Sequence, residues 1–135
     1  LHVAGYVEPA RLGELLATGD VHVVPLRAGL GRVSVPSKTS SIMAAARPVV
    51  AAIDPGTAVP RILEASGGGV AVPPDDVESF IGAVRRLVDD PAERAAMGAR
   101  GRDWVEHEAS PGAVGDAYHE LVQGLATRRP DRPSR

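Results

Sequence analysis

A chain of 135 residues can form one domain with a hydrophobic core, and its 44% hydrophobic content excludes a disordered protein. The formal net charge of -2 argues against nucleic acid as a partner, since nucleic-acid-binding domains carry a basic surface. The absence of cysteine excludes disulfides, thiolate zinc sites and thiol catalysis. No apolar run approaches the roughly 20 residues of a membrane span.

Short apolar runs alternate with helical stretches up to Asp90. We predict strands at residues 1–5, 21–26, 48–53 and 70–72, and the second is nearly continuous in apolar residues, as expected for a strand buried on both faces. Helices are predicted at 8–18, 36–46, 58–65 and 77–88. This alternation is typical of βαβ units, so we expect a parallel sheet with right-handed crossovers and helices on both faces.

The pattern changes after Asp90. Residues 91–107 and 110–126 are predicted to form two successive helices, and residues 128–135 have no apolar periodicity and are predicted to be a disordered tail. We therefore expect an α/β, Rossmann-like domain over residues 1–127 with extra C-terminal helices. Doubly wound domains usually have about five or six strands. Because the chain also opens in the middle of a predicted strand, we expect a fragment whose other strands lie upstream of Leu1.

The loop at residues 28–35 leaves the carboxyl end of a predicted strand, where ligands bind in open α/β sheets. Gly29 and Gly31 would let its backbone approach a ligand closely. The helix that follows opens with a proline, two hydroxyls and the only lysine of the chain: Pro36, Ser37, Lys38 and Thr39. Unpaired amides at the start of this helix and the lysine charge predict an anion site that suits phosphate. The alternative is a capped helix with a solvated lysine, since glycine-containing loops of this kind are common.

Other polar residues give weaker signals. His2, His107 and His119 lack metal-ligand spacing, and His22, within a predicted strand, is interpreted as structural. We therefore predict no metal, and nothing in the sequence indicates a cofactor. We expect the arginine pairs 85–86 and 100/102 to be solvated, and they are the residues that would contact an anionic lipid surface.

Residues 21–53 resemble the donor-site segment of family 4 type glycosyltransferases with the GT-B fold. That segment has a strand ending in Pro-Leu or Pro-Ser, a glycine-containing loop, a helix ending in a Met-Ala-Ala-Gly-Arg-Pro-like sequence, and a Val-Val-Ala strand. The corresponding pieces here are Val24-Pro25-Leu26, Met43-Ala44-Ala45-Ala46-Arg47-Pro48 and Val49-Val50-Ala51. Downstream, the similarity continues through Gly67-Gly68-Gly69-Val70, Val72-Pro73-Pro74-Asp75, Asp90-Pro91 and Met97-Gly98. In order and spacing these pieces cover nearly all of residues 3–122.

The resemblance implies the C-terminal, donor-binding half of a GT-B glycosyltransferase, truncated and inactive alone. Such an enzyme moves a sugar from a nucleoside diphosphate donor to an acceptor hydroxyl and needs no metal. The implied partners are the nucleotide sugar and a missing N-terminal acceptor domain, onto which the last helix would cross back. The Val-Pro-Ser-Lys sequence at 35–38 resembles a subgroup that builds bacterial surface polysaccharides. This favours polysaccharide or glycoconjugate biosynthesis in the cytoplasm, with peripheral membrane contact.

The chain departs from this family at three positions. Most members have two glutamates eight positions apart, where this chain has Val33 and Ser41, and Ala46 stands where glycine is usual. Ser41 can still bond a ribose hydroxyl, whereas Val33 cannot replace a carboxylate. The predicted donor-binding set is Gly29, Gly31, Val33, Pro36, Ser37, Lys38, Thr39 and Ser41, and no catalytic residue is identified. Two alternatives stay open: a half-domain of a sugar-nucleotide epimerase, and a non-catalytic nucleotide-sugar-binding module.

Overall fold

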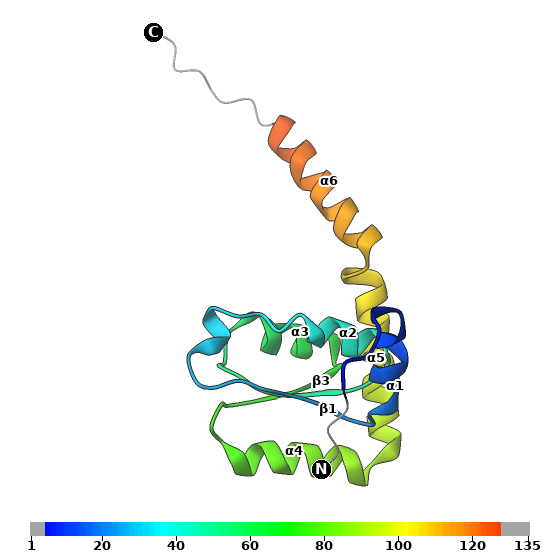
Figure 1. Cartoon of the computed structure of the whole chain (residues 1–135). Coiled ribbons are helices and arrows are strands. Elements are labelled where there is room, and N and C mark those ends of the chain that lie inside the picture. The colour runs from blue at the N-terminus through cyan, green and yellow to red at the C-terminus, as the bar shows by residue number, and fades with distance from the viewer. Residues whose placement is uncertain (1–4, 128–135) are drawn as a thin grey trace.

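A computed structural model describes residues 5–127 and shows an α/β fold (Figure 1). Its strands and helices follow the predicted order, with boundaries shifted by a few residues. The predicted strand at 1–5 lies almost entirely outside the described residues, and the predicted tail at 128–135 lies wholly outside them. The elements are η1 (Pro9–Arg11), α1 (Leu12–Thr18), β1 (His22–Pro25), η2 (Leu30–Arg32), α2 (Lys38–Ala44), β2 (Val49–Ala52), α3 (Ala58–Ser66), β3 (Gly69–Val72), α4 (Val77–Asp89), α5 (Pro91–Glu108) and α6 (Pro111–Thr127).

The three strands form one parallel sheet in the order β1-β2-β3, which confirms the predicted sheet type. His22 pairs with Val49, and Val49 pairs with Gly69, so the strands are level and their carboxyl ends share one edge. Helices α2 and α3 lie on one face and α4 on the other (Figure 1). The connections β1–α2–β2 and β2–α3–β3 cross over in the same direction along the sheet, so α2 and α3 lie on the same face. Helix α4, which follows β3, lies on the opposite face.

Strand β2 is the centre of the core and is buried along its whole length. Its side chains alternate between the two faces, as the strand period requires. Val49, Ala51 and Ile53 pack under α2 and α3, together with Ile42, Met43, Val59 and Leu63. Val50 points the other way, into a smaller cluster with Leu87 of α4 and Met97 of α5. One short strand therefore supplies both cores.

Strand β1 differs from its prediction as a strand buried on both faces. Val24 is buried, but Val23 is 49% exposed, because β1 is an edge strand in the described part of the chain and pairs only with β2. Pro25 suits such an edge, since proline has no N–H to donate to a further strand. The apolar run at 21–26 correctly predicted a strand, but its burial depends on a second neighbour.

Helix α5 approaches the sheet closely through glycines. A Cβ atom on Gly98 would collide with the carbonyl oxygen of Ala46, and one on Gly68 would lie 2.7 Å from the Cα atom of Gly101. A larger residue at these positions would push α5 away from the end of α2 and the start of β3. This close approach explains the glycines in the Met-Gly and Gly-Gly-Gly segments as packing contacts.

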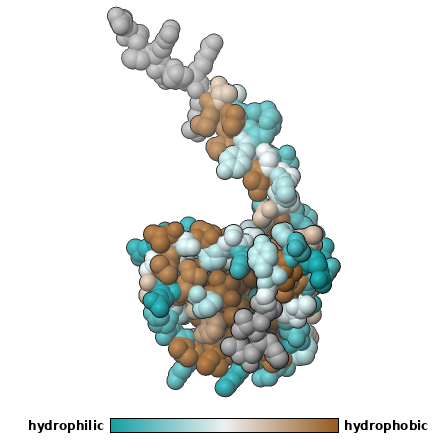
Figure 2. Space-filling model, viewed as in Figure 1, coloured by the Kyte–Doolittle hydropathy of each residue, from teal (hydrophilic) through white to brown (hydrophobic). Residues whose placement is uncertain are grey.

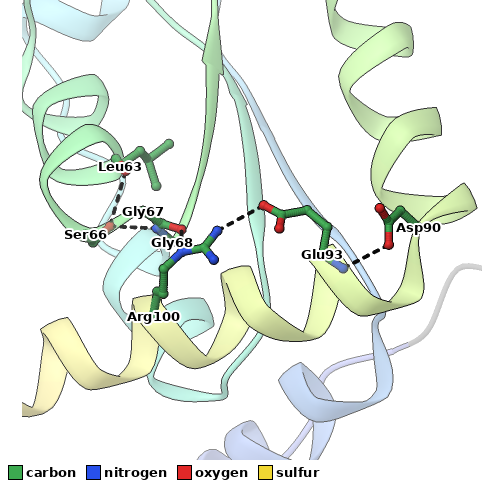
Figure 3. A network of polar contacts seen from close by, with 7 residues as sticks. All are labelled: Leu63, Ser66, Gly67, Gly68, Asp90, Glu93 and Arg100. Atoms are coloured by element: carbon green, nitrogen blue, oxygen red, sulfur yellow. Dashed lines mark hydrogen bonds and ion pairs between the residues drawn. The ribbon is translucent and has the colours of Figure 1, made fainter.

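A polar network holds α5 against the connection between α3 and β3 (Figure 3). The Arg100 Nε donates to the carbonyl of Gly67 at 3.2 Å, and its Nη2 lies 3.0 Å from Glu93 Oε1. Asp90 caps α5, because its Oδ1 accepts from the backbone N–H of Glu93 at 2.9 Å. Gly67 ends α3 with a φ of 60° in the left-handed region that favours glycine. The network thus fixes α5 at both its cap and its middle.

Helix α6 projects away from the body of the domain (Figure 1). Hydrophobic side chains are visible along it in Figure 2. Five large apolar residues recur at helical spacing and are all exposed: Val114, Tyr118, Leu121, Val122 and Leu125. An apolar stripe of this kind is normally buried against another surface.

Ala46 has a φ of 54°, in the left-handed region that an alanine side chain strains. Replacing Ala46 with glycine relieves about 1–2 kcal/mol of strain, offset by about 0.4–1 kcal/mol of added unfolded-chain entropy. We therefore expect Ala46→Gly to raise the free energy of unfolding by roughly 0.5–1 kcal/mol in chemical denaturation. The control is Ala96→Gly at an exposed position within α5, which should lower it by about 1 kcal/mol. A loss of stability in both variants would contradict the strain at Ala46.

Candidate functional site at the carboxyl edge of the sheet

The carboxyl ends of β1, β2 and β3 face the same edge of the sheet, and each is followed by a loop. The loop after β1 leads through η2 to α2 and holds most of the predicted donor-binding residues. The loop after β2 begins with Ile53 and Asp54. Neighbouring parallel strands bring these two loops together, which is the position at which open α/β sheets bind ligands.

Asp54 joins the two loops through a pair of hydrogen bonds. The backbone N–H of Gly29 donates to Asp54 Oδ1 and that of Gly31 to Oδ2, each at 2.9 Å. We call this arrangement the Asp54 clamp. Gly29 has a φ of 85°, and a Cβ atom on Gly31 would lie only 3.0 Å from Asp54 Oδ2. Both positions therefore require glycine to form the clamp.

The two glycine amides that were predicted to approach a ligand are thus bonded to a carboxylate of the chain itself. Further amides of the loop are bonded within it: Leu30 N–H donates to Arg27, and the N–H groups of Val33 and Ser34 both donate to the Leu30 carbonyl. These bonds fix the shape of the loop. A ligand that used the glycine amides would first have to displace Asp54.

Asp54 is the residue that sequence reasoning missed, because the Asp-Pro-Gly-Thr sequence was interpreted only as a turn. The available signal was a carboxylate directly after the predicted strand at 48–53. The neighbouring strand in the sheet is followed by the glycine-containing loop at 28–35. That juxtaposition depends on β1 and β2 being neighbours, which the sequence implies only once the sheet order is known.

The pKa of the Asp54 carboxyl is held below its usual value. The main cause is the hydrogen bond from the Gly29 amide, followed by that from Gly31, and the charge of Arg32 acts in the same direction. Desolvation raises the pKa but is a smaller effect than either of the two hydrogen bonds. The carboxylate is therefore ionised throughout the neutral range, and the clamp is closed there.

The start of α2 presents Ser37 and Lys38 at the surface. Lys38 and Pro36 line a groove of ≈ 520 Å³ whose other walls come mainly from α1 and β1. Within the described residues, the Ser37 hydroxyl caps no backbone amide, although Ser37 occupies the N-cap position. An exposed cation and an uncapped hydroxyl on consecutive residues are thus available to anionic groups at the start of α2.

Thr39 and Ser41 lie differently from each other. The Thr39 side chain is 2% exposed, and its Oγ1 has no hydrogen-bond partner among residues 5–127. Ser41 lines a second groove, of ≈ 470 Å³, with Leu12 of α1 and Arg102 of α5. Val33 is 81% exposed on the loop. The fold therefore brings Pro36, Lys38 and Ser41 toward α1, buries Thr39, and leaves Val33 on the outside.

The described residues contain no group of three or more potential ligands that could hold a metal ion. Within residues 5–127, no helix is both long and apolar enough to cross a membrane.

The open parallel sheet, with its helices on both faces and a loop site at its carboxyl edge, defines a Rossmann-like α/β domain. Residues 1–90 match the family described as glycosyl transferases group 1. The chain therefore belongs to this family, and its fold is that of part of a GT-B glycosyltransferase domain of the family 4 type.

Two curated relatives are similar to the chain. A probable glycosyltransferase, WbjE of Pseudomonas aeruginosa, is 37% identical over 78 residues, which is 58% of this chain and 18% of that protein. A GDP-mannose-dependent monoacylated alpha-(1-6)-phosphatidylinositol monomannoside mannosyltransferase of Corynebacterium glutamicum is 31% identical over 127 residues, 88% of this chain and 31% of that protein. The chain thus spans less than a third of the length of either relative.

The lowered pKa of Asp54 leads to a test in acid. Because the folded pKa is depressed, the stability that Asp54 contributes is fully present above the ordinary aspartate pKa of about 3.9. It is lost as the pH falls through the lower pKa of the folded chain. We expect the amide proton shifts of Gly29 and Gly31, measured by NMR, to stay constant near neutral pH and to move together in this acidic range. Asp54→Asn should abolish that movement, and glycine shifts that ignore acid in the wild type would contradict the clamp.

Proposed function

We propose that the chain is the donor-binding domain of a glycosyltransferase that transfers a sugar from a nucleoside diphosphate to an acceptor hydroxyl. Membership of the glycosyl transferases group 1 family supports this proposal. The observation that carries it is the exposed Lys38, beside the uncapped hydroxyl of Ser37, at the carboxyl edge of the sheet. A cation and a hydroxyl at this place suit the negative charge that develops on a leaving diphosphate.

The proposed donor contact is centred on Lys38 rather than on the glycine amides of the preceding loop. Asp54 already bonds both amides, whereas Lys38 is exposed at the start of α2. Helix α2 has only seven residues, so the charge of Lys38 contributes more than the helix dipole. Ser41 in the neighbouring groove remains the proposed ribose contact, and Val33 leaves the sugar without a carboxylate partner at that position.

We further propose that residues 1–127 form a partial domain, completed by strands upstream and by an N-terminal acceptor domain. Two surfaces support this. The outer edge of β1 has no paired strand in the described chain, and Val23 is half-exposed there. The apolar stripe of α6 is exposed along its length, which suits packing on a second domain. The relatives, of which the chain covers 18% and 31%, leave room for such parts.

The proposed setting is polysaccharide or glycoconjugate biosynthesis in a bacterial cytoplasm, with peripheral contact to the membrane. The name of the Corynebacterium relative includes a phosphatidylinositol monomannoside, which supports a membrane-associated acceptor for this chain too. Guanosine diphosphate, the nucleotide in that name, is accordingly the first nucleotide to test.

A non-catalytic nucleotide-sugar-binding module is the second candidate. Val33 and Ser41, at the positions of the two family glutamates, favour it, because neither can act as a carboxylate. Incubating the full-length protein with a panel of nucleotide sugars distinguishes the two. Release of nucleoside diphosphate with transfer or hydrolysis of the sugar supports the enzyme, whereas binding without turnover supports the module.

Replacing Lys38 with alanine should weaken binding of a nucleoside diphosphate about tenfold or more, since charged hydrogen bonds contribute roughly 1.5–3 kcal/mol. The measurement is calorimetric titration of the full-length protein with several nucleoside diphosphates at fixed salt. Folding stability should be unchanged or slightly higher, because a cation is mildly unfavourable in the first turn of a helix.

The matched control is Arg85→Ala, which removes an exposed cation from α4, away from the carboxyl-edge loops. It should leave the affinity unchanged at the same ionic strength. Equal affinities of wild type and Lys38→Ala for every nucleotide that binds would remove Lys38 from the donor site.

The isolated chain of residues 1–135 should not transfer sugar at the rate of the full-length protein, because the proposed acceptor domain is missing from it. The assay compares both proteins with the same nucleotide sugar and acceptor. Comparable turnover by the isolated chain would refute the two-domain proposal.

A further inference from the structure

We propose that Asp54 is a positioning residue for donor binding, which fixes the loop between β1 and α2 so that Lys38 can meet the donor diphosphate. This inference rests on the proposed function of the chain. It also assigns the anion-binding amides of Gly29 and Gly31 to an internal carboxylate rather than to the donor.

The clamp is bidentate and joins parts of the chain that are far apart in sequence. Each carboxylate oxygen of Asp54 accepts one glycine amide at 2.9 Å, across 25 and 23 residues respectively. Hydrogen bonds to an ionised acceptor are stronger than those between neutral groups, and two of them fix orientation as well as distance. The position of Asp54 therefore determines where the loop lies over the sheet.

Asp54 follows the buried central strand β2 closely in sequence. Ile53, the residue before it, is buried and donates its N–H to the Val72 carbonyl at 3.0 Å. On the other side, Thr57 Oγ1 donates to the Asp54 carbonyl at 2.7 Å. The carboxylate thus ties the position of the loop to that of the central strand. A change at Asp54 should therefore change the position of Lys38.

The loop around Gly31 fits closely against Asp54 and its neighbours. Gly31 is buried, and a side chain there would press on Asp54, on Ile53 and on Thr57. Gly31 lies within the 3-10 turn η2, after which the Val33 N–H donates to the Leu30 carbonyl at 3.1 Å. The loop is therefore already ordered before a donor binds, so that binding does not have to meet that ordering cost.

The clamp also restricts where the donor diphosphate can lie. Both glycine amides are occupied, and the ionised carboxylate that occupies them repels a second anion at the same place. Arg27, Arg32 and Lys38 are the exposed cations of the loop and α2, and under the proposed function Lys38 makes the anion contact. Asp54 in this way keeps the phosphates away from the two glycine amides.

The first test is hydrogen exchange of backbone amides in the full-length protein, comparing wild type with Asp54→Asn. The asparagine amide group cannot accept from both glycines, so exchange at Gly29 and Gly31 should become faster while that at Val50 in the core stays unchanged. Asp89→Asn, at the exposed end of α4, is the matched control and should leave all three unchanged. Unchanged glycine exchange in Asp54→Asn would overturn the clamp.

The second test is nucleoside diphosphate affinity in a double-mutant cycle. Asp54→Asn should weaken binding of guanosine diphosphate, or of the best binder in a nucleotide panel, by about tenfold. The donor KM should rise with little change in kcat, as for a residue that acts on binding. In a Lys38→Ala background, Asp54→Asn should cause little further loss, because both changes remove the same contact. A purely structural role would give the same loss in both backgrounds, which would overturn the positioning role.

Gly31→Ala provides a second variant that disturbs the clamp from the loop side while keeping Asp54. It should reproduce the faster exchange at Gly29 and the weaker nucleotide affinity. If wild type binds no nucleoside diphosphate, the proposed function fails, and with it the role of Asp54 in donor binding. If wild type binds but Asp54→Asn and Gly31→Ala bind equally well, only the positioning role is overturned.

Discussion

The burial of β2 on both faces is the constraint on which the rest of the structure depends. Val49, Ala51 and Ile53 are covered by α2 and α3, while Val50 is covered by α4 and α5. Each of the valine and isoleucine side chains stabilises the fold by roughly 1.5–3 kcal/mol when fully buried. Because the strand is fixed on both sides, the residue that follows it is fixed too. Asp54 therefore owes its place at the carboxyl edge to apolar packing.

The site adds a local electrostatic requirement to this apolar frame. The loop after β1 offers inward amides, and the fold satisfies them with a carboxylate of its own rather than leaving them for a ligand. The exposed cation Lys38 follows this loop, at the start of α2. The carboxyl edge thus carries a negative group, Asp54, that holds the loop and a positive group, Lys38, at the start of α2. Under the proposed function the donor phosphates bind at Lys38.

Two surfaces of the described chain are suited to further partners for the same physical reason. The outer edge of β1 keeps backbone groups that a neighbouring strand would bond, and α6 exposes an apolar stripe that water solvates poorly. Both surfaces accord with the proposal that additional strands and an acceptor domain complete this half of a GT-B enzyme. The glycine contacts of α5 hold the domain together independently of either surface.

Periodicity in the sequence was sufficient to predict the order of strands and helices and the parallel sheet, while the family resemblance rested on short motifs in a fixed order. Local patterns repeat every two or nearly four residues and need no knowledge of distant contacts. The burial of β1, the burial of Thr39 and the partner of the glycine amides were decided by tertiary structure alone. Each depends on which elements become neighbours: β1 has one strand beside it, Thr39 turns toward the core, and Asp54 meets Gly29 and Gly31 across more than twenty residues only because β1 and β2 pair.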